Sequence, residues 1–403
     1  MSASLSPPRS ATDPARTTRS QWLAVAVLSL STFVVVTSEM LPVGVLTPMA
    51  DGLGITQGAA GYSLSITGLV TAVTAPLVPR LLGRLDRRLV LASAMVVLAA
   101  GNALTAVAPG FGLLVVSRAL LGIGMGVVWG LAAVIASRLV APRNAALAVS
   151  FAVSGVAAAS VIGVPLGTVV GNAFGWRTAF AVLAGGGIAL AAGLALALPR
   201  LPRPAAPAGA GAGTGGQSLL GTPAVAAGLA LIVLLVTAHF AAYTYVRPVL
   251  EERTGLAPGS IALALLAYGA CGLAGNFAAG ALAARRARFT LLSLATGIGA
   301  AIALLALLGS VAGVAYAAVA LWGLTYGGLS VGGQIWMTQS APHRTEHVTG
   351  LYVGVFTAAI ALGAFLGGTV VEASGVTPLL WSAAALALAG LAVGAVGPGP
   401  ARR

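Results

Sequence analysis

Charged side chains are scarce in this chain, and acids are the scarcest. Of its 403 residues 7% are charged and eight are acidic, while 58% are hydrophobic. Soluble domains carry about a quarter charged residues. The lone cysteine, Cys271, cannot form an intrachain disulfide, and three histidines supply little for a metal cluster. These shortages argue against an enzyme or a metal site, and they indicate a membrane protein without catalytic residues.

Long apolar runs fill most of the chain. A helix needs roughly 20 apolar residues to cross the hydrocarbon core of a bilayer, whereas a barrel strand shows about 10 residues of alternating polarity. The runs here are long and continuously apolar, so they predict twelve transmembrane helices and leave no room for a soluble catalytic domain. The predicted spans are 22–46, 58–80, 88–108, 111–136, 145–171, 177–198, 222–246, 258–284, 288–308, 311–338, 346–371 and 377–397.

The arginines indicate how the spans cross the membrane. All 21 basic residues are arginine, and seventeen of them fall in the tails, linker and loops that share one predicted side. Arg177, Arg247 and Arg253 fall on the other side, and Arg118 lies within the fourth span. Because loops rich in positive charge stay in the cytoplasm, both termini are predicted to be cytoplasmic. The net charge of +13 therefore reflects topology, not nucleic-acid binding.

Composition divides the chain into two halves. Residues 1–20 are predicted to be a disordered cytoplasmic tail, and the Pro/Gly/Ala-rich stretch 199–221 a cytoplasmic linker. Residues 21–198 and 222–398 each form a predicted six-helix bundle, and 399–403 a second cytoplasmic tail. The stretches "GVPLGTVVG" and "GAFLGGTVV" hint at a repeat. The predicted fold is an all-α membrane protein with two pseudo-symmetric bundles, a common transporter plan.

Glu39 and Arg118 are charged residues well inside predicted spans. Glu39 lies in "VVVTSEMLPVGVL", about seven residues before the end of the first span, or roughly 10 Å deep. Arg118 lies at a similar depth in the fourth span. A charge there costs several kcal/mol unless it is paired or hydrated. Two hypotheses stay open: the residues form a fixed structural pair, or Glu39 carries protons and substrate while Arg118 tunes its proton affinity.

Small residues and a proline mark the fourth and fifth spans. Gly122 and Gly126 lie on one helix face, where small residues let another backbone approach closely. In "GVPLG", Gly163, Pro165 and Gly167 combine close packing with a bend, because proline removes a helical hydrogen bond. Ordinary packing would also explain these residues. A bend at a packed glycine face nevertheless suits helices that rock during transport.

The loop after the second span carries the sequence "GRLDRR", with Gly83, Asp86, Arg87 and Arg88. Its arginines serve as topology determinants on charge alone. Asp86 is the exception, since an acid among arginines can pair with a basic neighbour or a helix N-terminus. We therefore predict a gating or interdomain role for Asp86.

Aromatic residues gather near the end of the seventh span, in "HFAAYTYVRP". His239, Phe240 and Tyr243 could line a polar cavity and contact a substrate. An interfacial aromatic belt is the competing interpretation, and it fits Tyr245 best. Trp129 and Trp336, in the fourth and tenth spans, are weaker candidates for stacking a ligand.

These residues together resemble the major facilitator superfamily, and within it the twelve-helix drug:proton antiporter branch that includes bacterial multidrug, sugar and purine efflux permeases. The resemblance covers about residues 20–397. "GRLDRR" is similar to the motif between helices 2 and 3, although Leu82 stands in the usual glycine place and Gly83 is one place late. Arg118 and the glycines after it resemble the helix 4 motif, and "GVPLG" with "GWRTAF" resembles the helix 5 antiporter motif.

The resemblance implies a proton-coupled transporter of the bacterial cytoplasmic membrane that exports a small amphipathic or hydrophobic molecule, such as a drug or antibiotic, by alternating access. Glu39 takes the place of the helix 1 acid of this branch and would bind the proton, with Arg118 shifting its affinity. The proton gradient would supply energy without a cofactor. The partners would be the substrate, protons and the lipid bilayer, not nucleic acid, and we expect a monomer.

Other transport activities share nearly every feature of this sequence. A sugar, nucleoside or amino-acid efflux permease, a proton-coupled uptake symporter and a facilitator remain alternatives. An embedded enzyme would need a nucleophile, a metal cluster or paired acids, which the sequence does not supply.

Overall fold

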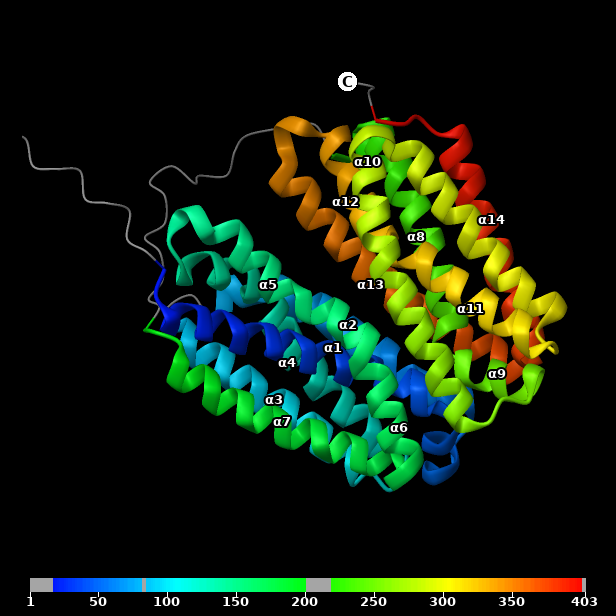
Figure 1. Cartoon of the computed structure of the whole chain (residues 1–403), viewed down its shortest axis with the longest axis horizontal. Helices are drawn as coiled ribbons and strands as arrows, with labels where there is room; N and C mark the ends of the chain where they lie inside the picture. The colour runs from blue at the N-terminus through cyan, green and yellow to red at the C-terminus, as the bar shows by residue number, and fades with distance from the viewer. Residues whose placement is uncertain (1–16, 82–84, 201–218, 401–403) are drawn as a thin grey trace, which may run out of the picture.

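The computed structural model describes residues 17–81, 85–200 and 219–400, and these residues are helical almost throughout. Figure 1 shows two bundles of helices side by side, with no strand among the described residues. The first bundle contains α1 (Arg19–Leu53), α2 (Gln57–Leu81), α3 (Arg87–Ala106), α4 (Phe111–Leu139), α5 (Ala145–Ala158), α6 (Val164–Phe174) and α7 (Trp176–Ala197). The second contains α8 (Pro223–Tyr243), α9 (Val246–Thr254), α10 (Pro258–Leu308), α11 (Ala312–Gly327), α12 (Leu329–Ser340), α13 (Thr345–Ser374) and α14 (Val376–Val396).

Eleven helical segments of the described chain are long and apolar enough to cross a membrane. One of them, α10, has 51 residues, far more than the roughly 20 that a bilayer requires. Its backbone leaves helical geometry at Arg286 (φ −142°, ψ 61°). The predicted spans 258–284 and 288–308 are therefore two limbs of α10 that meet at a kink without a loop. The predicted all-α fold of two bundles is confirmed.

Corresponding turns in the two bundles use the same local chemistry. Gly54 after α1 and Gly255 after α9 have φ of 63° and 68°, a left-handed conformation that glycine adopts without steric cost. Gly175 and Gly375 have φ of 88° and 82° and join the last two helical segments of each bundle. Because each pair occupies the same place in its bundle, the two halves share one structural plan.

The glycine faces predicted in the fourth and fifth spans pack against neighbouring helices. A Cβ at Gly122 would lie 2.8 Å from the Thr67 carbonyl oxygen, and one at Gly126 2.8 Å from Thr74 Cβ, so α4 packs closely on α2. A Cβ at Gly167 would lie 2.6 Å from Leu41 Cδ1, and Gly163 abuts Thr37 on the same helix, α1. These glycines let helix backbones approach more closely than alanine permits.

The bend predicted at Pro165 takes the form of a π turn. Residues Ala159–Gly163 form a π-helical segment between α5 and α6, with Pro165 in the first turn that follows. Proline cannot donate to the carbonyl four residues earlier, and π turns commonly accommodate such interruptions. The turn packs against Gly269 of the second bundle, where a Cβ would lie 2.6 Å from Val161 Cα. The bend therefore lies at the junction between the bundles.

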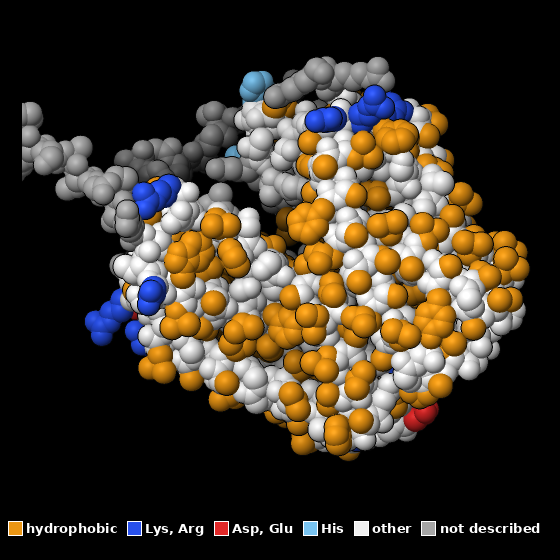
Figure 2. All heavy atoms as spheres, in the orientation of Figure 1, with side chains coloured by type: hydrophobic (Ala, Val, Ile, Leu, Met, Phe, Trp, Pro, Cys, Tyr) orange, Lys and Arg blue, Asp and Glu red, His pale blue; other side chains and the backbone are white. Residues whose placement is uncertain are grey.

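The bundles meet at one end and diverge toward the other. In Figure 1 they approach each other near α6 and α9, away from the labelled C-terminus. A buried apolar cluster at the meeting end combines Leu41, Leu46 and Trp176 of the first bundle with Tyr245 and Leu379 of the second. Figure 2 shows apolar side chains over most of the surface and basic side chains at the opposite ends of the bundles, where the surface is indented between them.

The glycine contacts lead to a stability prediction. Replacing Gly122 by alanine places a methyl group against the Thr67 carbonyl and the Val70 side chain, each 2.8 Å from the new Cβ. Such overpacking typically costs about 1–3 kcal/mol, so the temperature of heat-induced aggregation in detergent should fall. Gly185→Ala is the matched control, because a Cβ there meets nothing within 4 Å. The control should leave the temperature unchanged or raise it; an equal fall in both variants would contradict the packing argument.

Candidate functional site between the two bundles

Glu39 lies deep in the first bundle, close to the second. It is 4% exposed and stands fourteen residues before the end of α1 at Leu53. α1 continues through Pro42 and Pro48, beyond the span end predicted at residue 46. Its neighbours Met40 and Val43 pack into the apolar core of the second bundle. Glu39 therefore lies close to the junction of the two halves.

Arg118 is fully buried, as its sequence position predicts, but it forms no fixed pair with Glu39. Its Nη1 donates to the Ser38 carbonyl oxygen at 3.1 Å, and its guanidinium carbon lies 4.7 Å from the centre of the Phe180 ring. The other two guanidinium nitrogens and Glu39 Oε1 have no hydrogen-bond partner in the described structure. Arg118 and Glu39 are within electrostatic range without contact.

The carbonyl that Arg118 binds is available because of a proline. A helical carbonyl normally accepts from the N–H four residues later, and for Ser38 that residue is Pro42, which has none. An unpaired carbonyl inside a bilayer costs several kcal/mol. The Arg118 guanidinium thus satisfies a backbone group one residue from Glu39 and fixes its own place relative to that carboxyl.

An aromatic cluster of the second bundle surrounds His239. Its ring stacks on Tyr326 with centroids 3.4 Å apart and an interplanar angle of 9°, and on Tyr243 at 4.9 Å. The edges of Phe240 and Trp322 complete the enclosure at 4.7 and 5.5 Å. The structure thus places the predicted His239, Phe240 and Tyr243 in one cluster.

Sequence reasoning missed the three members of this cluster that come from other helices. Tyr268 on α10 stacks on Tyr243 at 4.5 Å, and its hydroxyl lies 3.4 Å from His239 Nε2. Trp322 and Tyr326 lie on α11, four residues apart and hence on one helix face. The spacing of four residues could have predicted from the sequence that these two rings lie side by side. Tyr243, Tyr268 and Trp322 belong to the apolar core into which Met40 and Val43 of α1, close to Glu39 in the chain, also pack.

The two tryptophan candidates lie away from this cluster. Trp336 is fully buried, and its indole N–H donates to the Ala224 carbonyl at 2.8 Å. It packs between α12 and α8 in this structure, and a role in stacking a ligand stays a prediction. Trp129 is 36% exposed on α4 and makes no ring contact with the cluster.

The loop between α2 and α3 is only partly described, and Gly83 lies outside the described residues. Asp86 caps the N-terminus of α3 and accepts a hydrogen bond from the Arg88 backbone N–H at 3.0 Å. Arg87 is buried at the start of the same helix. The cap orients α3, as an acid at a helix N-terminus does, while the gating role of Asp86, Arg87 and Arg88 stays a prediction.

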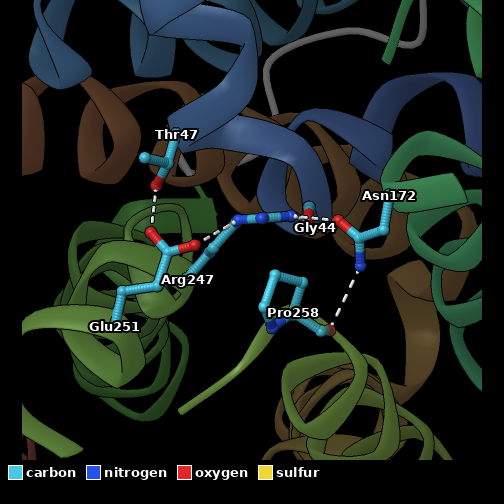
Figure 3. A network of polar contacts seen from close by, with 6 residues as sticks. All are labelled: Gly44, Thr47, Asn172, Arg247, Glu251 and Pro258. Atoms are coloured by element: carbon cyan, nitrogen blue, oxygen red, sulfur yellow. Dashed lines mark hydrogen bonds and ion pairs between the residues drawn. The ribbon is translucent and has the colours of Figure 1, made fainter. Parts of the chain in front are cut away.

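At the meeting end of the bundles, a polar network connects the two halves (Figure 3). Arg247 of α9 donates to the Gly44 carbonyl at 2.6 Å and to Asn172 Oδ1 at 3.0 Å, both in the first bundle. Its Nε pairs with Glu251 at 2.8 Å, and Glu251 accepts a hydrogen bond from Thr47 of α1. Asn172 in turn donates to the Pro258 carbonyl at 3.1 Å.

A second set of contacts between the halves lies between α2 and α13. Tyr245, which fits an interfacial aromatic belt in the sequence, is fully buried instead. Its hydroxyl is 3.3 Å from the Gly58 carbonyl of the first bundle and 3.1 Å from that of Ala364. Thr56 donates to Glu372 at 2.5 Å. Glu251 and Glu372 therefore both accept hydrogen bonds from the first bundle and hold the bundles together.

Comparisons with known proteins agree with this architecture. The sequence model of the Major Facilitator Superfamily matches residues 28–368. The purine ribonucleoside efflux pump NepI of Escherichia coli O6:H1 is 32% identical over 377 residues, which cover 93% of this chain and 94% of that protein. The transcription regulatory protein OpdE of Pseudomonas aeruginosa is 32% identical over 367 residues, 91% of each chain.

Solved structures share the fold at low sequence identity. A bacterial homologue of the human lysosomal transporter Spinster, in an inward-facing and occupied conformation, has a TM-score of 0.75 at 14% identity and covers 95% of this chain and 97% of its own. The unoccupied form of a Spinster homologue has a TM-score of 0.67 at 15% identity, with 94% of each chain covered. Since the family model and the relatives at 32% identity both cover most of the sequence, this chain is a multi-pass membrane transporter that belongs to the major facilitator superfamily.

Proposed function

We propose that this transporter exports a small amphipathic or hydrophobic molecule in exchange for protons. The observation that supports the proposal most strongly is the position of Glu39, a buried carboxyl with an unpartnered oxygen on a segment of α1 that packs against the second bundle. Ionisable residues inside membrane spans are rare and usually functional, because burying them is costly. A proton or a polar group of a substrate would satisfy this carboxyl during a transport cycle.

Arg118 would couple the position of Glu39 to its charge. The guanidinium is held on the Ser38 carbonyl and against Phe180. A movement of α1 relative to α4 would change the distance between the two charges, and a nearby opposite charge alters how strongly a carboxyl holds its proton. Proton uptake on one side and release on the other would then follow from the conformational change, with the proton gradient as energy source and no cofactor.

The His239 cluster would supply the apolar part of the substrate site. Its rings offer stacking surfaces, and His239 Nδ1 and Thr237 Oγ1 are buried polar atoms without a partner in the described structure. A substrate with a ring and a few polar atoms would match this combination. Glu39 and Arg118 on the opposite side of the junction would contact the polar end of such a molecule.

A purine ribonucleoside is the second candidate substrate. The observation that favours it is the parallel stacking of flat rings around His239 and Tyr326, which suits a planar base. The relative NepI is named as a purine ribonucleoside efflux pump. Transport of a nucleoside would retain every role given above for Glu39 and Arg118.

We also propose an orientation in the bacterial cytoplasmic membrane with both termini in the cytoplasm. The arginine-rich ends of the bundles would then face the cytoplasm, in keeping with the positive-inside rule. In this orientation the meeting end with the Arg247 network is the outer end. The protein would act as a monomer.

Replacing Glu39 by glutamine tests the proton role. Glutamine keeps the size of the side chain and cannot titrate, so substrate-driven proton movement in inverted membrane vesicles should disappear. The readout is the fluorescence of a pH-sensitive dye trapped inside the vesicles, followed while substrate is added. Glu252→Gln is the control, because Glu252 is an exposed carboxyl on the short helix α9, and it should behave as wild type.

The same vesicles distinguish the alternatives to proton-driven export. Export predicts that substrate accumulates in inverted vesicles when the interior is acidified, whereas an uptake symporter would deplete it and a facilitator would ignore the gradient. Normal proton-coupled transport by Glu39→Gln would remove Glu39 from the mechanism.

Replacing Tyr326 tests the substrate site. Tyr326→Leu removes the ring that stacks on His239 at 3.4 Å, and stacking on one aromatic ring is worth about 1–3 kcal/mol. The apparent KM should therefore rise roughly tenfold or more, while Tyr326→Phe should stay close to wild type. Trp129→Leu, outside the cluster, is the control.

The assay should use a purine ribonucleoside and a lipophilic fluorescent dye in parallel. If only the nucleoside is transported, and Tyr326→Leu changes its KM, the result would favour a purine ribonucleoside as substrate. An equal KM for Tyr326→Leu and wild type with every transported substrate would contradict a site at this cluster.

A further inference from the structure

Pro48 leaves the Gly44 carbonyl without a helical donor, in the same way that Pro42 frees the carbonyl of Ser38. The N–H that Gly44 would normally bind belongs to residue 48, and proline has none. The α1 backbone also departs from helical geometry next to this point, at Val45 (φ −122°, ψ 18°). Arg247 Nη1 supplies the missing donor at 2.6 Å.

The carbonyls of Ser38 and Gly44 receive their hydrogen bonds from different halves of the protein. Ser38 receives Arg118 from α4 in its own bundle, at 3.1 Å. Gly44 receives Arg247 from α9 in the other bundle. The Arg118 contact can therefore persist when the bundles move relative to each other, whereas the Arg247 contact exists only while the meeting end is closed.

Arg247 is positioned for this contact by its own bundle. Its Nε pairs at 2.8 Å with Glu251, four residues later on α9, and the residue is only 3% exposed. The guanidinium therefore keeps a counter-charge whether or not Gly44 is present. Separation of the bundles would break hydrogen bonds to neutral groups, the Gly44 carbonyl and Asn172 Oδ1, without pulling opposite charges apart.

We propose that Arg247 is a detachable latch on the Gly44 carbonyl that holds the outer end of the transporter closed. This inference rests on the proposed function, because it assumes an outer end that opens during transport. Closed, the guanidinium satisfies a buried carbonyl whose usual helical donor is missing at Pro48. Open, water entering the outer cavity satisfies both, so the latch is reversible.

Two other arginines at the same end of the fold provide matched controls. Arg177 donates to the carbonyls of Gly52 and Ala108 at 3.2 and 3.0 Å, all within the first bundle. Arg253 donates to Thr377 and to the Ala306 carbonyl at 3.1 and 2.6 Å, all within the second. Each control arginine donates two hydrogen bonds, compared with three for Arg247, but neither connects the halves.

The test measures access to a cysteine behind the latch. Cys271→Ala provides a background without native cysteine, and Leu265→Cys provides the reporter. Leu265 is 1% exposed, and its Cδ1 lies 3.5 Å from where a Cβ of Gly44 would be, across the junction. A membrane-impermeant maleimide is applied to intact cells and to inverted vesicles, and the labelling rate is followed for each variant.

Arg247→Gln should accelerate labelling from the outside of intact cells roughly tenfold, the usual effect of losing a hydrogen bond from a charged donor. Arg177→Gln and Arg253→Gln should leave the rate unchanged. Glu251→Gln removes the counter-charge of Arg247 and should also accelerate labelling from the outside. It replaces Arg247→Gln in the test if that variant does not reach the membrane. Unchanged rates in both Arg247→Gln and Glu251→Gln would overturn the proposal.

Pro48→Ala distinguishes a latch on the carbonyl from a general loosening of the interface. Alanine restores the N–H that Gly44 lacks, so Arg247→Gln should accelerate labelling less in the Pro48→Ala background than alone. An equal acceleration in both backgrounds would overturn the role of the Gly44 carbonyl.

Labelling needs neither substrate nor a proton gradient, so it reports separately from transport. Loss of the proposed function would appear as absent proton-coupled transport in wild type, whatever the labelling rates. Faster labelling of Arg247→Gln in inverted vesicles only would contradict the proposal that Arg247 closes the outer end, because the meeting end would then face the cytoplasm.

Discussion

Two prolines in α1 leave the carbonyls of Ser38 and Gly44 without helical donors, and the arrangement of both bundles depends on how these groups are satisfied. A bilayer interior offers no water to an unpaired carbonyl. Arg118 satisfies the first and Arg247 the second. The two arginines thus perform the same task on one helix, and this shared task explains why both can be buried in a chain with few charges.

The segment between the two carbonyls also contains Glu39. The proposed proton carrier lies one residue after Ser38 and five before Gly44, so a change in the bend of α1 would alter its surroundings on both sides. Met40 and Val43 on this segment pack against the second bundle. Under the proposals above, α1 is the element through which proton binding at Glu39 and closure at Gly44 influence each other, because both depend on the same stretch of irregular helix.

Much of the fold could be predicted from the sequence, since span length and continuous hydrophobicity are local properties. Burial of Glu39 and Arg118 could also be predicted, because a charged side chain inside a long apolar span avoids the lipid and faces the protein interior. The Arg247 network could not, since Arg247 and Glu251 lie at a span end where solvated charges are the ordinary expectation. Contacts of α9 with α1 and with Asn172 of α6 hold Arg247 buried and Glu251 half-buried, and such contacts between distant segments leave no local pattern.

The same reason explains the aromatic cluster and Tyr245. His239, Phe240 and Tyr243 are neighbours in the sequence and could be grouped from it, whereas Tyr268 and Tyr326 come from helices whose rotation the sequence does not fix. Tyr245 has the position of an interfacial residue in the span predicted to end at residue 246. In the structure its side chain lies against Gly61 of α2 and Gly367 of α13, and its hydroxyl donates to the carbonyls of Gly58 and Ala364.

The contacts between the halves share a property that suits repeated opening. Each of these hydrogen bonds has at least one neutral partner. The bonds are Arg247 to Gly44 and Asn172, Thr47 to Glu251, Thr56 to Glu372, Asn172 to Pro258 and Tyr245 to Gly58. The ion pair of the network, Arg247 with Glu251, lies within one half. Separating buried opposite charges is strongly unfavourable, whereas water can replace hydrogen bonds to neutral groups at small net cost. An ion pair kept inside one half therefore gives a closed end that is specific in its geometry and still able to open.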